Sequence, residues 1–488
     1  MKTTFDEIYE TISEFGLNVD EGGEVMIDRF LLTDIARRYG TPVHVVNLNR
    51  LAQNCLDFQN AFQKEYSGKV SVHYAFQCNP VAGIIRTIKG TGIKAEVMSE
   101  FELKLACNLG FRGEEIIVNG PCKTNSLITD CIQFGVRYLV IDSLDELDKI
   151  RKIAKGTGHV RVLLRINPDY IPKGMSSNAA SGCHSHSAPG FDIKSDEVRV
   201  AFQVIQKASN IEFEGFHFNI GTCITRPDDY YNAILKLTPL VDLVQDFGFY
   251  IRTMDVGGGI ASETSKAMSS KEWFYYHALN RLPRKTDHFH RPSYSEYASS
   301  IHHAIQDVFD GEWNPELILE PGRCITSNSQ LLLVGVHQVK RRKGAGIWIT
   351  TDGGIGTVCM PTFNEFHKII LCDNIYRPPS EYVTLNGPGY FTADVVYRNI
   401  LMPELRVGDK LAIMDSGAYF TSGESNFGYP RPGVVAVNEK SVELIRRKES
   451  FEDWIGRDIT NKNGNGIYPS YAKKNEYLSP VEDSKSGN

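Results

Sequence analysis

The sequence predicts an α/β protein in which a (β/α)8 barrel is followed by a separate all-β domain. Three observations lead to this prediction. From about residue 70, short β-rich runs alternate with helical stretches. Eight such runs occur before residue 325, and strand-like runs dominate the chain after it. Strands that alternate with helices form parallel sheets, and eight of them suggest a sheet closed into a barrel.

The eight β-rich runs follow one another in βα order. They cover residues 70–77, 94–99, 115–120, 138–143, 161–167, 213–221, 251–259 and 317–322. Amphipathic stretches at 99–111 and 143–156 are two of the expected intervening helices. The first of them opens on Ser99, followed by a glutamate-bearing turn, which predicts a capped helix start there.

The composition divides the chain into four expected segments. Residues 1–42 form an N-terminal helix and a segment that joins the β-domain, and residues 43–324 form the barrel. Residues 325–450 form the β-domain, in which Gly, Pro, Asn and Asp separate the strand-like runs. Residues 451–488 form a polar tail rich in Gly, Asn and Ser, which we expect to be disordered.

Composition also excludes several classes of function. The 488 residues carry a net charge of −6, which argues against a general binder of nucleic acid or anionic membranes. Ten scattered cysteines without a CxxC motif favour a reducing compartment. There is no run of about 18 apolar residues and no apolar signal segment. We therefore expect a cytoplasmic protein.

Two long insertions interrupt the barrel pattern, at residues 168–193 and 262–294. Both would emerge at the C-terminal face, where barrel active sites lie. They contain two His-x-His pairs, His184/His186 and His288/His290. This spacing occurs among metal ligands, but it is also ordinary for loop histidines, and we predict no metal site. When protonated, the pairs could instead bind an acidic or phosphorylated substrate.

The ends of the last three barrel strands carry groups suited to a phosphate. Gly257, Gly258 and Gly259 end strand seven, Arg323 follows strand eight, and Thr222 follows strand six. Glycines let backbone N–H groups approach an anion, and Arg323 adds a charge and a fork of donors. Each motif alone could be a turn or a structural ion pair. Their place on consecutive strand ends favours a phosphate site, to which Tyr419 of the β-domain could send its hydroxyl group.

The order of these motifs resembles the fold-type III decarboxylases that use pyridoxal 5'-phosphate (PLP), namely the diaminopimelate, ornithine and arginine decarboxylases. The resemblance covers residues 20–445. It implies an alanine-racemase-like fold, PLP as the cofactor, and carboxy-lyase chemistry on a small amino-acid-like substrate. It also implies a homodimer whose active sites are shared between the subunits.

The resemblance assigns much of the cofactor site. Glu320 matches the carboxylate that pairs with the pyridine nitrogen and keeps the ring an electron sink. The phosphate-binding elements match the residues described above: Gly257, Gly258, Gly259, Arg323, Tyr419 and Thr222, with Thr222 replacing the usual serine. Glu96 falls near an acidic residue of the family at the barrel mouth.

Three positions depart from the family pattern. Gln77 stands where the family has the lysine that binds PLP covalently, and an amide nitrogen is not nucleophilic. Asn219 replaces a histidine that lies over the cofactor ring. In the motif that a neighbouring subunit lends to the site, Tyr390 replaces a cysteine and Phe391 an acidic residue, while Asp394 is kept. These changes affect chemistry and spare the phosphate and pyridine contacts.

Three hypotheses about function follow. The chain could be a decarboxylase-like enzyme that binds PLP noncovalently, with chemistry altered by loss of the lysine, in a specialised biosynthetic pathway. It could be an inactive homologue that binds a partner protein. It could also use the phosphate site for a different ligand. Two other lysines offer no clear replacement: Lys94 lies at the entry end of its strand, and Lys123 reads as a lysine facing solvent or phosphate.

Overall fold

The structure is a computed structural model that describes residues 8–9, 12–175, 183–184, 186–279, 291–358, 365–389 and 391–458. Contacts divide the chain into two units, Met1–Lys448 and Glu449–Asn488. The described part of the second unit contains one helix, α17 (Phe451–Ile455). In the described part of the chain, no helix is long and apolar enough to cross a membrane.

Eight parallel strands form the predicted barrel. They are β5 (Val70–Ala75), β6 (Lys94–Val97), β7 (Ile116–Val118), β8 (Tyr138–Ile141), β9 (Val160–Asn167), β11 (Ile211–His217), β12 (Thr253–Asp255) and β14 (Glu316–Leu319). The pairing of β14 with β5 closes the sheet. Each predicted run overlaps one of these strands, although β9, β11 and β14 begin one or two residues before their runs. The short strand β10 (Phe191–Asp192) adds to the edge of β9.

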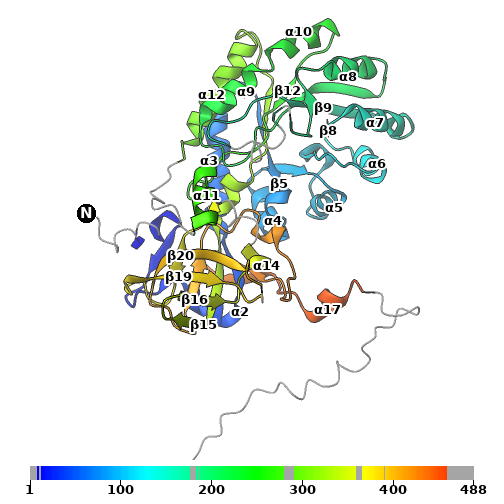
Figure 1. Cartoon of the computed structure of the whole chain (residues 1–488). Coiled ribbons are helices and arrows are strands. Elements are labelled where there is room, and N and C mark those ends of the chain that lie inside the picture. Colours follow the sequence, from blue (N-terminus) through cyan, green and yellow to red (C-terminus); the bar gives the residue numbers. More distant parts are fainter. Residues whose placement is uncertain are drawn as a thin grey trace, which may run out of the picture. The chain divides into compact units, whose positions relative to one another are not determined.

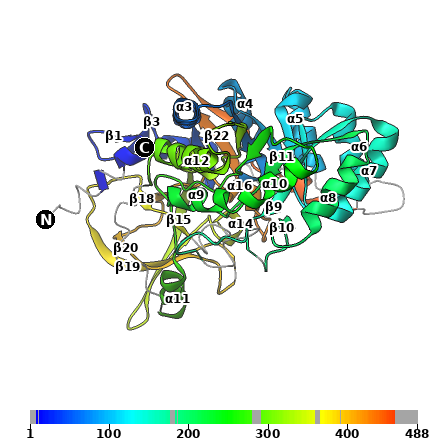
Figure 2. The same cartoon turned by 90° about the horizontal axis from the view of Figure 1, so that it is seen from above.

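Helices surround the barrel strands (Figures 1 and 2). They are α3 (Leu48–Glu65), α4 (Ala82–Gly90), α5 (Glu100–Asn108), α6 (Asn125–Phe134), α7 (Leu144–Thr157), α8 (Glu197–Gln206), α9 (Pro227–Leu235), α10 (Thr238–Asp246) and α12 (Tyr294–Val308). The predicted cap at Ser99 is confirmed, because its hydroxyl accepts a hydrogen bond from the backbone N–H of Glu102.

The barrel is filled with side chains rather than open. Ile117, Tyr138, Val140, Leu163 and Ile318 form a cluster of their own, and each is almost fully buried. A second and larger apolar cluster joins the strands to the surrounding helices. The interior is therefore packed, and chemistry is confined to the rim at the strand ends.

The second sheet belongs to the β-domain. Its strands are β4 (Val43–Asn47), β15 (Gln330–Arg342), β16 (Gly346–Thr351), β18 (Ile369–Leu371), β19 (Pro379–Asn386), β20 (Val395–Pro403), β21 (Lys410–Ile413), β22 (Gly433–Val437) and β23 (Val442–Arg446). β4 pairs with β15 and β22. The barrel therefore begins at α3, five residues after the predicted boundary at residue 43.

The N-terminal segment is more regular than the sequence suggested. β1 (Leu17–Val19), β2 (Val25–Ile27) and β3 (Phe30–Leu31) form a small antiparallel sheet, followed by α2 (Leu32–Tyr39). Their apolar side chains share one cluster with those of β4 and β22. The segment therefore packs on the β-domain.

Candidate active site

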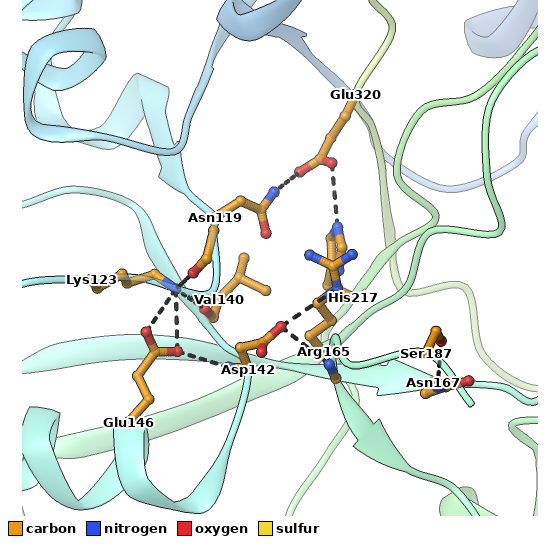
Figure 3. Close-up of polar contacts among 12 residues, drawn as sticks. Asn119, Lys123, Val140, Asp142, Glu146, Arg165, Asn167, Ser187, His217 and Glu320 are labelled. Carbon is orange, nitrogen blue, oxygen red and sulfur yellow. Dashed lines mark hydrogen bonds and ion pairs between the residues drawn. The ribbon is translucent and has the colours of Figure 1, made fainter. Parts of the chain in front are cut away.

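A group of buried polar side chains lies at the C-terminal ends of four barrel strands. Glu320, which follows β14, accepts a hydrogen bond from Asn119 Nδ2 at 2.6 Å. Its other carboxylate oxygen lies 3.3 Å from His217 Nε2, at the end of β11. Asp255 ends β12 and accepts a hydrogen bond from the N–H of Gly257. Figure 3 shows Asn119 and His217 converging on Glu320 from two sides.

Burial and crowding keep protons on this group. The pKa of Glu320 is raised to about 7, chiefly by burial. Burial and then the Glu320 charge also raise the pKa values of Glu96 and Asp255. Burial lowers the pKa of His217 to about 4, so its imidazole is neutral at pH 7. The group is thus a set of carboxylates that share protons beside a neutral histidine.

The same position could also attract a metal ion. One ligand atom each from His217, Asp255 and Glu320 lies within 4.8 Å of the others. A metal ion here would occupy the carboxylate that the resemblance assigns to a pyridine nitrogen. The two uses of Glu320 therefore exclude each other.

The raised pKa of Glu320 predicts a specific dependence of stability on pH. Between its ordinary value of 4.5 and its folded value of about 7, the folded chain holds a proton that the unfolded chain has lost. Stability therefore falls as pH rises through this window, by up to about 1.4 kcal/mol per pH unit for one proton. Glu320→Gln has no such proton and should show a flatter curve.

Urea unfolding of both proteins from pH 4 to 8 measures this effect. The free energy of unfolding of Glu320→Gln should rise relative to that of the parent protein across the window. Two parallel curves would show that Glu320 titrates normally in the folded chain.

The three glycines after β12 are needed where strand ends pack closely. A Cβ on Gly258 would lie 2.3 Å from the carbonyl oxygen of Glu320, and one on Gly259 would lie 2.4 Å from that of Gly221. Gly257 and Gly259 also have φ of 67° and 94°. The N–H groups of Gly258 and Gly259 have no acceptor among the described residues. They remain available to an anion.

Arg323 has a partner that the sequence did not reveal. It opens the short helix α13 (Arg323–Thr326), and its side chain is 7% exposed. Nη1 donates to Glu365 Oε2 at 2.6 Å, and Nε is buried without a hydrogen-bond partner in the described structure. The ring of Tyr419 lies 5.0 Å from the guanidinium carbon. The predicted phosphate ligand is therefore already paired with a carboxylate.

Glu365 belongs to a short strand, β17 (Glu365–Phe366), that ties the second insertion to the β-domain. β17 pairs with β13 (Lys266–Ala267), where Ala267 lies opposite Glu365. α11 (Ser270–Leu279) follows β13. The described part of the second insertion thus contains one strand of a two-stranded sheet and a helix.

Two of the departures from the family pattern lie at the barrel mouth. Gln77 is exposed in the turn Phe76–Cys78, directly after β5, while both of its neighbours are buried. Asn219 is half-buried, and its Oδ1 accepts a hydrogen bond from the N–H of Gly221 at 3.0 Å. Thr222 is exposed beside it. Asn219 therefore supports its own turn through its amide oxygen.

The third departure lies in the β-domain. Tyr390 falls outside the described residues. Asp394 is buried, and its two oxygens accept hydrogen bonds from the N–H groups of Ile355 and Gly389, both at 2.6 Å. Phe391 is exposed and packs against Phe427, with ring centroids 5.9 Å apart. Within one chain, Asp394 thus orders two β-domain loops.

Neither candidate lysine is free to replace the missing one. Lys94 begins β6 and donates to Ser71 Oγ at the opposite end of the barrel. Lys123 is fully buried, contrary to the expectation of a lysine facing solvent or phosphate. Its Nζ donates to the carbonyls of Gly120 and Val140 and to both oxygens of Glu146 at 3.1 and 3.2 Å (Figure 3).

Lys123→Met should therefore damage the fold. Glu146 is itself buried, and loss of its partner strands a negative charge, which costs about 3–5 kcal/mol. Urea unfolding should show this loss in the single variant and recover most of it in Lys123→Met/Glu146→Leu, which leaves no buried charge. A single variant as stable as the parent would mean that the pair contributes little.

Of the two His-x-His pairs, only His184 and His186 lie in the described part of the chain. His184 Nδ1 accepts a hydrogen bond from the N–H of His186 at 3.2 Å. His288 and His290 lie outside the described residues.

The family is decided by comparison with known proteins. A sequence model of the pyridoxal-dependent decarboxylases, covering their pyridoxal-binding domain, matches residues 48–327. The chain belongs to the pyridoxal-dependent decarboxylase family. Diaminopimelate decarboxylase of Archaeoglobus fulgidus is 30% identical over 441 residues, which are 89% of this chain and 96% of that protein.

Solved decarboxylase structures share the fold of this family member. The crystal structure of diaminopimelate decarboxylase from M. jannaschii superposes with a TM-score of 0.81 at 27% identity, covering 92% of this chain and 99% of that one. The same enzyme has been solved in complex with L-lysine, with the same score and coverage. The expectations of a barrel with a C-terminal β-domain and of family membership are confirmed.

PLP is the cofactor of this family, and most of the site fits it. Glu320 offers a buried carboxylate to a ring nitrogen, and the N–H groups of Gly258 and Gly259 are available to a phosphate. Gln77 does not fit a covalent link. The sequence missed Asn119, His217, Asp255 and Glu365. His217 and Asp255 each stand two residues before a predicted site residue, on the same side of an extended strand end, which is a usable signal.

Proposed function

We propose that the chain binds PLP noncovalently and acts on an amino acid or an amino-acid-derived substrate in a specialised biosynthetic pathway. The observation that carries this proposal is the contrast between two parts of one site. The pyridine end retains a buried, hydrogen-bonded carboxylate at Glu320, whereas Gln77 offers no nucleophile. Loss of the lysine should still allow PLP to bind and should change the reaction that the bound cofactor supports.

The chain's own residues would divide the work as follows. Glu320 would hold a proton at the ring nitrogen, oriented by Asn119 and His217. The amides of Gly258 and Gly259 would donate to the phosphate. PLP, when bound, supplies an electron sink for cleavage of a bond next to the amino group. No lysine at position 77 would move protons between substrate and solvent, so turnover should be slow.

The relatives support an amino acid as the class of substrate. Several are diaminopimelate decarboxylases, and one structure of such an enzyme contains L-lysine. Release of CO2 from diaminopimelate and from a panel of amino acids, with and without added PLP, tests the proposal. PLP-dependent release that disappears in Glu320→Ala would support it. No release with any substrate, from a protein that also fails to bind PLP, would contradict it.

Two other functions are each favoured by one observation. Loss of the lysine at position 77 is what an inactive homologue that binds a partner protein would show. The pairing of Arg323 with Glu365 is what a site adapted to a ligand other than PLP could show. Saturable binding of PLP together with PLP-dependent release of CO2 would argue against both.

We also propose a cytosolic homodimer with shared active sites. The nine cysteines in the described residues are all free thiols, which suits a reducing compartment. Phe391, Phe427 and Tyr429 are exposed together beside the Asp394 loop, where the family resemblance places a subunit contact. Light scattering should give about twice the chain mass of 54.7 kDa. A monomer at every concentration would contradict this.

A further inference from the structure

We propose that Glu365 is a specificity-determining residue that lowers the affinity of the site for phosphate. PLP is then an exchangeable ligand rather than a permanently bound one. The inference rests on the proposed function, because it concerns the phosphate end of the same site. It goes further by assigning a role to a residue outside the family motifs. It also explains why one predicted phosphate ligand is already paired.

The Arg323–Glu365 pair is buried on both sides. The side chains are 7% and 8% exposed, and the bonded atoms are 2.6 Å apart. The Arg323 charge lowers the pKa of Glu365 despite its burial, so the carboxylate is ionised and the pair is neutral overall. His367 Nε2 lies 3.5 Å from the same carboxylate oxygen.

Glu365 is also held in place by its backbone. β17 pairs with β13, and the carbonyl oxygen of Glu365 accepts a hydrogen bond from the hydroxyl of Tyr397 at 2.9 Å. Tyr397 is fully buried. The backbone of Glu365 is therefore fixed, and its carboxylate is held by the hydrogen bond from Arg323.

Glu365 should lower the affinity of the site for the phosphate group in particular. Among the predicted phosphate ligands, Arg323 carries the one full positive charge, since the others are glycine amides and hydroxyl groups. Glu365 neutralises that charge and takes one of its N–H donors, although Nε remains without a partner in the described structure. An arriving phosphate dianion would then feel repulsion from Glu365 as well as attraction to Arg323, at short range and in a poorly solvated site.

Removal of the competing charge tests this inference. Glu365→Gln keeps the size of the side chain and a hydrogen-bonding oxygen. PLP and pyridoxal, which lacks the phosphate, are titrated into the parent protein and the variant. The variant should bind PLP at least about tenfold more tightly, equivalent to about 1.4 kcal/mol, with the affinity for pyridoxal nearly unchanged. The parent protein should already discriminate only weakly between the two.

Glu316→Gln is the matched control, because Glu316 forms a similar pair with Arg137, also at 2.6 Å, at the opposite end of the barrel. It should leave both affinities unchanged. Equal PLP affinity in parent and Glu365→Gln would overturn the role of Glu365, as would equal tightening toward pyridoxal. If Glu365→Gln does not fold, strong preference of the parent for PLP over pyridoxal would overturn it. Absence of PLP binding in every protein would instead contradict the proposed function itself.

Discussion

Gln77→Lys should convert a protein that borohydride cannot label into one that carries a stoichiometric covalent PLP group. Gln77 is exposed in the turn after β5, at the mouth of the barrel, where a primary amine could meet the aldehyde of a bound cofactor. The rest of the site need not move, because Glu320 and the glycine amides lie on other strands. Mass spectrometry after borohydride treatment would locate the label at position 77.

Gln77→Arg is the control for charge alone, since a guanidinium adds a cation without a nucleophilic amine. It should bind PLP and remain unlabelled. If Gln77→Lys binds PLP and also remains unlabelled, position 77 does not face the cofactor aldehyde. The proposal that this site differs from the family chiefly by loss of the PLP-binding lysine at position 77 would then be wrong.

Gly258→Ala should cause a large loss of both stability and PLP binding. Its Cβ would lie 2.3 Å from the backbone oxygen of Glu320, which cannot rotate away. Overpacking against backbone should cost about 3 kcal/mol or more. Relief of this clash would also move Glu320 and the amides available to a phosphate. PLP binding should therefore be lost as well. Urea unfolding and PLP titration measure the two effects.

Gly156→Ala is the matched control. Gly156 lies in α7 with no atom within 4 Å of an added Cβ. Alanine is the better helix former, so stability should rise by up to about 1 kcal/mol and PLP affinity should not change. A Gly258→Ala variant that behaved like this control would show that the strand ends can adjust and that the glycine is not needed for close packing.

The barrel was predictable because its signals are local. Each strand is a short apolar run, and helix starts such as that at Ser99 have capping residues within one turn. β4 was misplaced for the opposite reason. Its apolar run at 43–47 looks like any buried strand, and only pairing with β15 and β22, hundreds of residues later, places it in the β-domain.

The candidate site was predictable where strand order brings residues together, as it does for Glu320 and the glycines. It was not predictable where a contact depends on packing between distant segments. Glu365 meets Arg323 from β17, a strand that pairs with β13 of the insertion and lies about forty residues after Arg323 in the chain. Lys123 was misjudged because nothing near it in the sequence announces its burial against Glu146, which lies on the following βα unit.

Noncovalent PLP binding is tested most directly by a PLP titration of the unmodified protein, followed by removal of unbound ligand and then borohydride treatment. Noncovalent binding predicts saturation with PLP and no stoichiometric PLP label at any one lysine. Absence of binding would contradict it, because the preserved pyridine and phosphate contacts would then serve another ligand. A stoichiometric PLP label at one lysine would contradict it equally, because another lysine would then take the place of the one that is absent at position 77.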